Sequence, residues 1–160
     1  MPEGGGSKVI RYALAIGVAI AFSGLSANAA SVAPDDVKIV DGAIAKSLTG
    51  VAGDPAKGRD WFKGRKLGNC LACHVNSDLK DQPYHGEVAP PLDGVADRWS
   101  EAELRAIVVN PKEALSEDTV MPSFYRVSGF NRVAKKFAGK TILSAQQVED
   151  VVAYLKTLKE

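Results

Sequence analysis

The sequence has little of several residue types, and each shortage excludes a class of protein. Its 160 residues include only 2 cysteines, too few for a scaffold held by several disulfides. The 15 glycines do not recur at every third position, which excludes a collagen-like chain. The formal net charge is +1 at pH 7, so no broad positive field favours nucleic acid as a partner. With 46% hydrophobic residues, the composition fits one small globular domain.

A long apolar run is also missing. Positions 12–22 are mostly apolar, whereas a membrane-spanning helix needs roughly 20 such residues. Lys8 and Arg11 precede this run and the small residues Ala-Asn-Ala follow it, an order typical of a secretory signal and its cleavage site. We therefore predict that residues 1–29 are a signal peptide and that the mature chain begins near Ala30, is periplasmic and has no membrane span. An uncleaved anchor is the alternative.

No clear strand alternation is present, but helix starts are legible. Asp54-Pro55 is the first, because aspartate caps orphan backbone donors and proline at the first helical position gives up no intrahelical bond. We expect this helix to reach about Arg65. The preceding residues 30–53 have no sustained period from position 31 onward, which predicts an extended N-terminal segment lying over the domain.

Two further helix starts have the capping-box pattern, a serine followed three residues later by Glu or Gln. They are Ser100 with Glu103, and Ser144 with Gln147. Pro111 should end the first of these helices. The second has an apolar stripe at helical spacing, formed by Val148, Val151, Val152 and Leu155. Together these features predict an all-α fold of small helices and long loops.

One motif carries chemistry. Cys70 to His74 has the C-x-x-C-H spacing of covalent c-type haem attachment. Two cysteines three positions apart on a helical turn can each form a thioether with a vinyl group of the same porphyrin, while the next side chain is aimed at the iron. We therefore predict one haem c, bound covalently through Cys70 and Cys73, with His74 as its proximal metal ligand.

Three other interpretations of the motif can be weighed. A disulfide between Cys70 and Cys73 would close too short a loop to constrain the unfolded chain strongly, and would leave His74 unexplained. A thioredoxin-like redox pair would follow a strand in a βαβ unit, which the preceding residues do not resemble. A zinc site that also used His85 would lack the usual spacing of four ligands.

Composition narrows the choice of a second axial ligand. Met121 is the sole methionine that remains after the signal is removed, and Pro122 favours extended backbone there, as in a loop that approaches the haem from outside. A gap-filling position in the core is the commoner use of methionine. His85 is the competing ligand, because the chain after His74 is long enough to pass around the iron, although its neighbours look like a polar surface loop.

These residues resemble the class I cytochromes c over residues 54–160, and more narrowly the SoxX family, the monohaem subunits of SoxAX cytochrome complexes in bacterial thiosulfate oxidation. The matching stretches are Ser47–Gly50, Gly53–Pro55, Cys70–His74, Ala89–Leu92, Gly94–Val95, Arg98–Trp99, Val120–Tyr125 and Ile142–Leu158. The resemblance implies a class I cytochrome c fold, with residues 54–160 as the cytochrome c domain wrapped around one haem.

The resemblance also implies roles for single residues. Pro90 falls where the family's backbone carbonyl accepts a hydrogen bond from the proximal histidine, which fixes the ring and raises its basicity. Leu92 would pack on the haem. Trp99 falls where some members bond a haem propionate, although a hydrophobic staple onto Leu104 explains it equally well.

Two more matching positions concern packing between the first and last helices. Gly58 and Phe62 correspond to the positions of the first helix that lie against the last helix, where Tyr154 and Leu155 would sit. A glycine at position 58 would let the two backbones cross closely.

An iron held by both His74 and Met121 has no open position for a substrate, so electron transfer is the expected activity. The resemblance implies a heterodimer with a SoxA-like haem subunit, a complex that joins thiosulfate to a cysteine of the SoxYZ carrier protein. This chain would be the electron-transfer subunit of that L-cysteine S-thiosulfotransferase, with no catalytic residue of its own, and would serve a downstream electron acceptor. A free periplasmic electron shuttle is the alternative. A haem-based sensor of small ligands or a peroxidase would need a labile sixth position.

Overall fold

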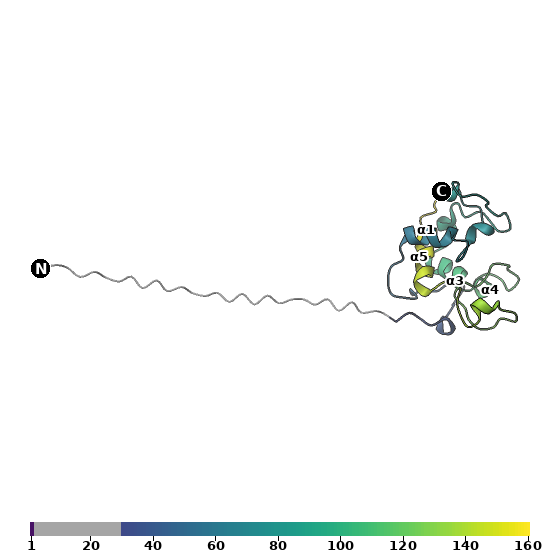
Figure 1. Cartoon of the computed structure of the whole chain (residues 1–160), viewed down its shortest axis with the longest axis horizontal. Helices are drawn as coiled ribbons and strands as arrows, with labels where there is room; N and C mark the ends of the chain where they lie inside the picture. The colour runs from purple at the N-terminus through teal and green to yellow at the C-terminus, as the bar shows by residue number, and fades with distance from the viewer. Residues whose placement is uncertain (2–29) are drawn as a thin grey trace.

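The computed structural model describes Met1 and residues 30–160, which Figure 1 shows as short helices connected by long loops. The predicted signal peptide, residues 1–29, lies outside the described residues except for Met1. Within the part of the chain that is described, no helix is both long and apolar enough to cross a membrane.

Helices are the regular elements of residues 30–160. The α-helices are α1 (Pro55–Lys63), α2 (Val95–Arg98), α3 (Glu101–Val109), α4 (Pro111–Ala114) and α5 (Ala145–Leu155). Four 3-10 turns accompany them: η1 (Pro34–Asp36), η2 (Cys70–Ala72), η3 (Ser77–Leu79) and η4 (Lys135–Phe137). Strands are absent from the described residues, which contain isolated β-bridges between Val40 and Ala43 and between His74 and Ala89. The prediction of an all-α architecture is confirmed.

The predicted start of α1 is confirmed, and its predicted end is two residues too far. The Asp54 carboxylate accepts hydrogen bonds from the backbone N–H groups at positions 56 and 57. The helix ends at Lys63 rather than near Arg65. Gly64 still donates its N–H to the helix but has ψ 106°, an extended value that turns the chain away from the helical path.

Both predicted capping boxes are present. The Ser100 hydroxyl accepts from the Glu103 N–H while the Glu103 carboxylate accepts from the Ser100 N–H, and Ser144 and Gln147 form the same reciprocal pair. Helix α3 stops before Pro111 as expected, but that proline then begins α4, a short helix that the sequence analysis did not predict. Proline is tolerated there because the first N–H groups of any helix have no intrahelical partner.

Helices α1 and α5 pack across one another (Figure 1), and α3 packs against α5. Gly58 permits the close approach: a Cβ built there would overlap the Asp150 carbonyl group and lie 2.8 Å from the Tyr154 Cβ. The Phe62 and Tyr154 rings meet edge to face with centroids 5.5 Å apart. The packing expected of Gly58 and Phe62 is therefore confirmed.

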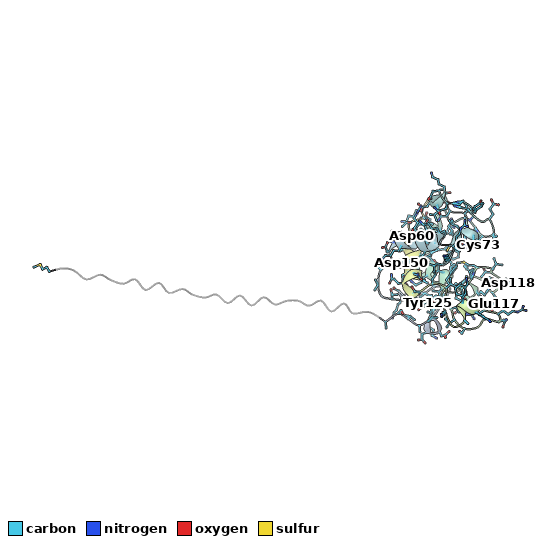
Figure 2. The ribbon with its side chains drawn as sticks, in the orientation of Figure 1. Asp60, Cys73, Glu117, Asp118, Tyr125 and Asp150 are labelled. Atoms are coloured by element: carbon cyan, nitrogen blue, oxygen red, sulfur yellow. The ribbon has the colours of Figure 1, made fainter. Side chains whose placement is uncertain are left out.

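A buried carboxylate of α5 adds polar contacts to this crossing. Asp150, labelled in Figure 2, accepts hydrogen bonds from the Asp54 backbone N–H at 2.9 Å and from the Trp61 indole N–H at 3.1 Å. Because these two donors lie at the start and in the body of α1, one side chain fixes both the position and the direction of that helix against α5.

A buried ion pair joins the N-terminal segment to α3 and α5. Arg105 and Glu149 are almost fully buried and lie 2.9 Å apart. Arg105 also donates to the Ile44 carbonyl, and Glu149 accepts from the Leu48 N–H at 2.7 Å. Burial alone would lower the pKa of the Arg105 guanidinium, but its bonds with Glu149 leave that pKa above its ordinary value. The segment at residues 31–53 contains the short η1 and the bridge between Val40 and Ala43. Its Ile44 and Leu48 belong to the core, which the sequence analysis did not foresee.

Candidate haem-attachment site

The two cysteines lie on one tight turn. Cys70 begins η2, and its carbonyl accepts hydrogen bonds from the N–H groups of Cys73, labelled in Figure 2, and His74 at 3.1 and 3.0 Å. Asn69, which precedes the turn, has a positive φ of 50°. Both thiols are free, so the disulfide interpretation has no support in the structure. Removal of its sulfur from water raises the pKa of Cys70 to about 12, although the residue as a whole keeps some exposed surface.

The orientation of His74 is set by a hydrogen bond to a carbonyl. Its Nδ1 lies 2.8 Å from the Pro90 carbonyl oxygen, and because a carbonyl can only accept, Nδ1 must carry the proton. The neutral ring then has its lone pair on Nε2, and no hydrogen bond to Nε2 occurs among the described residues. The imidazole is thus fixed in the tautomer that can bind a metal through Nε2.

Backbone hydrogen bonds position Pro90 for this contact. The Ala89 N–H donates to the Cys73 carbonyl at 3.0 Å and the Leu92 N–H donates to the Val75 carbonyl at 2.9 Å, so residues 89–92 run beside the end of the cysteine turn. Arg98 also holds this part of the chain, because it donates to the Pro91 carbonyl at 2.9 Å and to the carbonyl of the following Asp93 at 2.7 Å. Sequence analysis placed Arg98 in a matching stretch but gave it no role.

His85 is engaged elsewhere and does not present a free nitrogen. Its Nδ1 accepts from the Asn76 backbone N–H at 3.3 Å, and its Nε2 lies 3.0 Å from the Leu79 carbonyl, to which it must donate. A neutral imidazole has one donor and one acceptor, so both are used. This arrangement weakens the case for His85 as an axial ligand.

Met121 lies in the loop that connects α4 with Phe124. Its side chain is partly buried and packs against the hydrophobic core, and its N–H donates to the Thr119 hydroxyl at 3.3 Å. The Lys112 ammonium holds this loop by donating to the Thr119 carbonyl. The axial role of Met121 stays a prediction.

Leu92 and Trp99 are the two remaining residues expected to contact the haem. Leu92 is partly buried and packs against the core. Trp99 follows α2 and is 37% exposed, and its backbone N–H donates to the Val95 carbonyl. A partly exposed tryptophan is compatible with the propionate role, while the staple onto Leu104 stays equally open.

Asn76, two residues after the motif, is a positioning residue that sequence analysis missed. It is completely buried, and its side-chain amide donates to the Tyr154 hydroxyl at 3.0 Å. That hydroxyl donates to Asp78 at 2.7 Å, and Asp78 also forms an ion pair with Arg59 at 3.0 Å. The Tyr154 hydrogen bond and then the Arg59 contacts lower the pKa of Asp78. Burial raises the pKa of Tyr154, as does its bond to Asp78. The segment after His74 is therefore tied to α1 and α5.

The donor set fits a covalent haem better than a zinc ion. Among the described residues, no group of three or more His, Cys, Asp or Glu side chains is arranged to hold a metal ion. Two free thiols on one turn, an imidazole with its Nε2 available, and partly exposed apolar side chains at Leu92 and Met121 are the contacts that a thioether-linked porphyrin requires.

Comparison with known proteins gives a consistent result. A family model described as cytochrome c matches residues 55–159. Cytochrome c2 of Rhodospirillum rubrum is 31% identical over 130 residues, covering 67% of this chain and 99% of that protein. The crystal structure of SoxXA from P. pantotrophus contains a chain that is 50% identical, with a TM-score of 0.76, and the match covers 81% of this chain and 99% of that one.

Proposed function

The chain belongs to the cytochrome c family, and from that premise we propose that it is the monohaem electron-transfer subunit of a periplasmic SoxAX-type complex. Family membership confirms the expected all-α class I cytochrome c fold and haem c as the covalently bound cofactor. When bound, this cofactor supplies reversible one-electron chemistry at its iron.

The chain's own residues would hold and tune the cofactor. Cys70 and Cys73 would anchor it through sulfur, and His74 would bind the iron through Nε2. The hydrogen bond from His74 Nδ1 to the Pro90 carbonyl fixes the orientation of the ring and leaves Nε2 free. Met121 would supply the second protein ligand to the iron, which would exclude external ligands and favour the reduced iron. Leu92 and Trp99 would contact the porphyrin and one of its propionates.

The observation that carries this proposal is the tautomer of His74. An imidazole that served only as a structural side chain would need no free Nε2 beside two free thiols on the same turn. Pro90 and Arg98 act together here, because Arg98 holds the segment whose carbonyl orients the ring. The motif was selected by the spacing of its own residues, and the contact of His74 with Pro90, 16 positions away, supports it independently.

The 50% identity with a chain of SoxXA supports the choice of complex. In this proposal the chain forms a heterodimer with a SoxA-type haem subunit that joins thiosulfate to a cysteine thiol of a SoxYZ-type carrier. Formation of that S–S bond releases one proton and two electrons, so a one-electron carrier must be reduced twice per bond and reoxidised by a downstream acceptor. Both cysteines of this chain would be bound to haem, so the bond-making residues would belong to the partner.

A free electron shuttle is the second candidate, favoured by the 31% identity with cytochrome c2. Purification from the periplasm of producing cells separates the two functions. The proposed subunit should elute with a SoxA-type protein and show the visible spectrum of a low-spin c-type cytochrome, and its deletion should stop thiosulfate oxidation. A monomeric cytochrome whose deletion leaves thiosulfate oxidation intact would favour the shuttle.

Substitution of the two ligand candidates tests the axial assignment. We expect Met121→Ala to bind carbon monoxide readily in the ferrous state, because an axial position is then open. His85→Gln, the matched control, should keep the spectrum of the unaltered protein. If His85→Gln bound carbon monoxide and Met121→Ala kept the spectrum of the unaltered protein, the second ligand would be His85 and not Met121.

A further inference from the structure

A cavity of about 460 Å³ lies on the protein surface behind the cysteine turn. Its walls come from the end of α1 and the residues after it, from η2, and from the loop at residues 82–86. The residues that line it include Lys63, Arg65, Asn69, Leu71, Ala72 and Tyr84. Cys70, Cys73, His74 and Met121 do not line this cavity. His85 does line it, but both of its ring nitrogens are hydrogen-bonded to backbone groups, so the proposed haem ligands do not account for the cavity.

Backbone strain is concentrated around this cavity. Among the described residues, three non-glycine residues have a positive φ, and two of them, Asn69 at 50° and Tyr84 at 65°, line the cavity. Asparagine adopts this conformation fairly often, but for a bulky aromatic residue it is an outlier. Such strain persists where the surrounding structure forces it, and it is most common at functional sites.

Neighbouring contacts hold Tyr84 in this conformation. The Gln82 N–H donates to the Leu79 carbonyl at 2.8 Å, and the Gly86 N–H donates to the Leu71 carbonyl at 2.7 Å. A Cβ at Gly86 would overlap the Ala72 carbonyl group, so the loop lies directly against the cysteine turn. The backbone on both sides of Tyr84 is therefore fixed, and the ring is held outward.

The Tyr84 side chain is 85% exposed and carries a cation on its face. The Arg65 guanidinium lies 6.0 Å from the ring centroid, within the range of a cation–π contact. Lys63 is neutralised by Asp60 at 2.8 Å, whereas Arg65 forms no ion pair with any described residue. An exposed tyrosine beside an arginine at the rim of a cavity is the composition of an interface hot spot.

We propose that Tyr84 and Arg65 anchor the interface with the SoxA-type haem subunit, which inserts a side chain bearing a carboxylate or amide oxygen beside Arg65. This inference rests on the proposed function and identifies the surface that the partner uses. The cavity wall includes Leu71 and Ala72, which lie between the two cysteines. A partner seated there adjoins the turn that carries the cofactor, which suits a subunit that exchanges electrons with it.

Tyr84→Gly is the informative variant, because it should weaken binding of the partner without lowering the stability of the chain. Glycine adopts a positive φ without strain, so the melting temperature of the haem-loaded chain should stay the same or rise. The affinity for the purified SoxA-type subunit, measured by calorimetry, should fall by about tenfold or more, as for loss of a hot-spot side chain. Arg65→Gln should also weaken binding, with the stability retained.

The chain offers a matched control on another loop. Arg126 lies over the Phe130 ring at 5.1 Å, and Phe130 is 42% exposed. Phe130→Ala therefore removes a similar exposed aromatic and cation pair from a segment that does not line the cavity, and it should leave the affinity unchanged.

Each other outcome overturns the inference. If Tyr84→Gly bound the SoxA-type subunit with unchanged affinity, Tyr84 would not anchor the interface, while the proposed function would still stand. A fall in both stability and affinity would show that Tyr84 is needed for folding instead. An equal loss of affinity in Phe130→Ala would show that the effect is not specific to the residues of the cavity. If the unaltered chain formed no complex with the SoxA-type subunit, the proposed function would fail together with this inference.

Discussion

Two regions of the fold differ in how closely they are packed: the crossing of α1 and α5, and the segment from Asn69 to Gly86. At the crossing, Gly58 removes the side chain that would obstruct packing, and the polar groups of Asp150 are bonded across the helices. In the segment, two residues other than glycine, Asn69 and Tyr84, have a positive φ. The turn that carries the cysteines is partly exposed, and a cavity lies beside it.

The difference shows where stability and function reside in this fold. The crossing has the features of a region selected for tight packing, whereas the segment retains strain and exposed groups that a merely stable chain would replace. Substitutions at the crossing should therefore destabilise the protein strongly, and suitable substitutions in the segment should have small or even stabilising effects.

The largest effect is expected from Gly58→Ala. The added methyl group would overlap the backbone of α5 at Asp150, which cannot move without separating the helices. We expect the free energy of unfolding to fall by about 3 kcal/mol, measured by urea denaturation of the haem-loaded protein. Gly64→Ala, just after the same helix and with φ −66°, should change it by less than about 1 kcal/mol. Equal effects at the two positions would contradict the importance of the crossing.

A smaller loss is expected from Tyr154→Phe. This change removes the hydroxyl that accepts from the fully buried Asn76 amide and leaves that donor without a partner. We expect destabilisation by about 2 kcal/mol. Tyr125→Phe is the control, since the Val32 carbonyl that its hydroxyl contacts belongs to an exposed residue and can bond water; it should lose about 1 kcal/mol. If Tyr125→Phe lowered the free energy of unfolding more than Tyr154→Phe did, the hydroxyl at the crossing would not be the more important of the two.

The same network predicts a pH dependence. The Tyr154 hydrogen bond and Arg59 lower the pKa of Asp78 in the folded state, so the stabilisation from Asp78 is present above its unfolded pKa of about 4 and is lost as the pH falls through the lower folded value. Asp78→Asn should flatten the decline of stability below about pH 4, by less than about 1 kcal/mol because Asp78 is partly exposed. An unchanged pH profile would contradict this prediction.

The smallest effect is expected in the strained segment, with the opposite sign. Asn69→Gly should raise the free energy of unfolding by about 0.5 kcal/mol, because glycine adopts the positive φ of this position without strain. Asn131→Gly, where φ is not positive, should lower stability slightly. A loss at position 69 would mean that the asparagine side chain, and not only the backbone, supports the cysteine turn.

Local signals account for what could be predicted from the sequence. Helix starts depend on residues within one turn of each other, so Asp54 and the two capping boxes were found correctly. The C-x-x-C-H motif is equally local, because five consecutive residues define it. Pro90 and Gly58 required the family resemblance, since nothing in their own neighbourhood indicates which distant group they contact.

Contacts between distant residues account for what was missed. Arg105 and Glu149 are 44 positions apart, and Asn76 and Tyr154 are 78 apart. Each member of these pairs is an ordinary polar residue in the sequence, and only the fold shows that both are buried against each other. The positive φ of Tyr84 was equally hidden, because it is imposed by the neighbouring hydrogen bonds and not by the residue type.

The contact of α1 with α5 has a consequence for the order of folding. It joins residues 96 positions apart, as the bond between Asp54 and Asp150 illustrates, and closing so long a loop carries an entropic penalty that slows folding. The crossing cannot form until the last helix has been synthesised, so a nascent chain lacks its main stabilising contact until translation is nearly complete. In the proposed site the haem would link Cys70 to Met121 and so shorten this loop, which should speed the final closure.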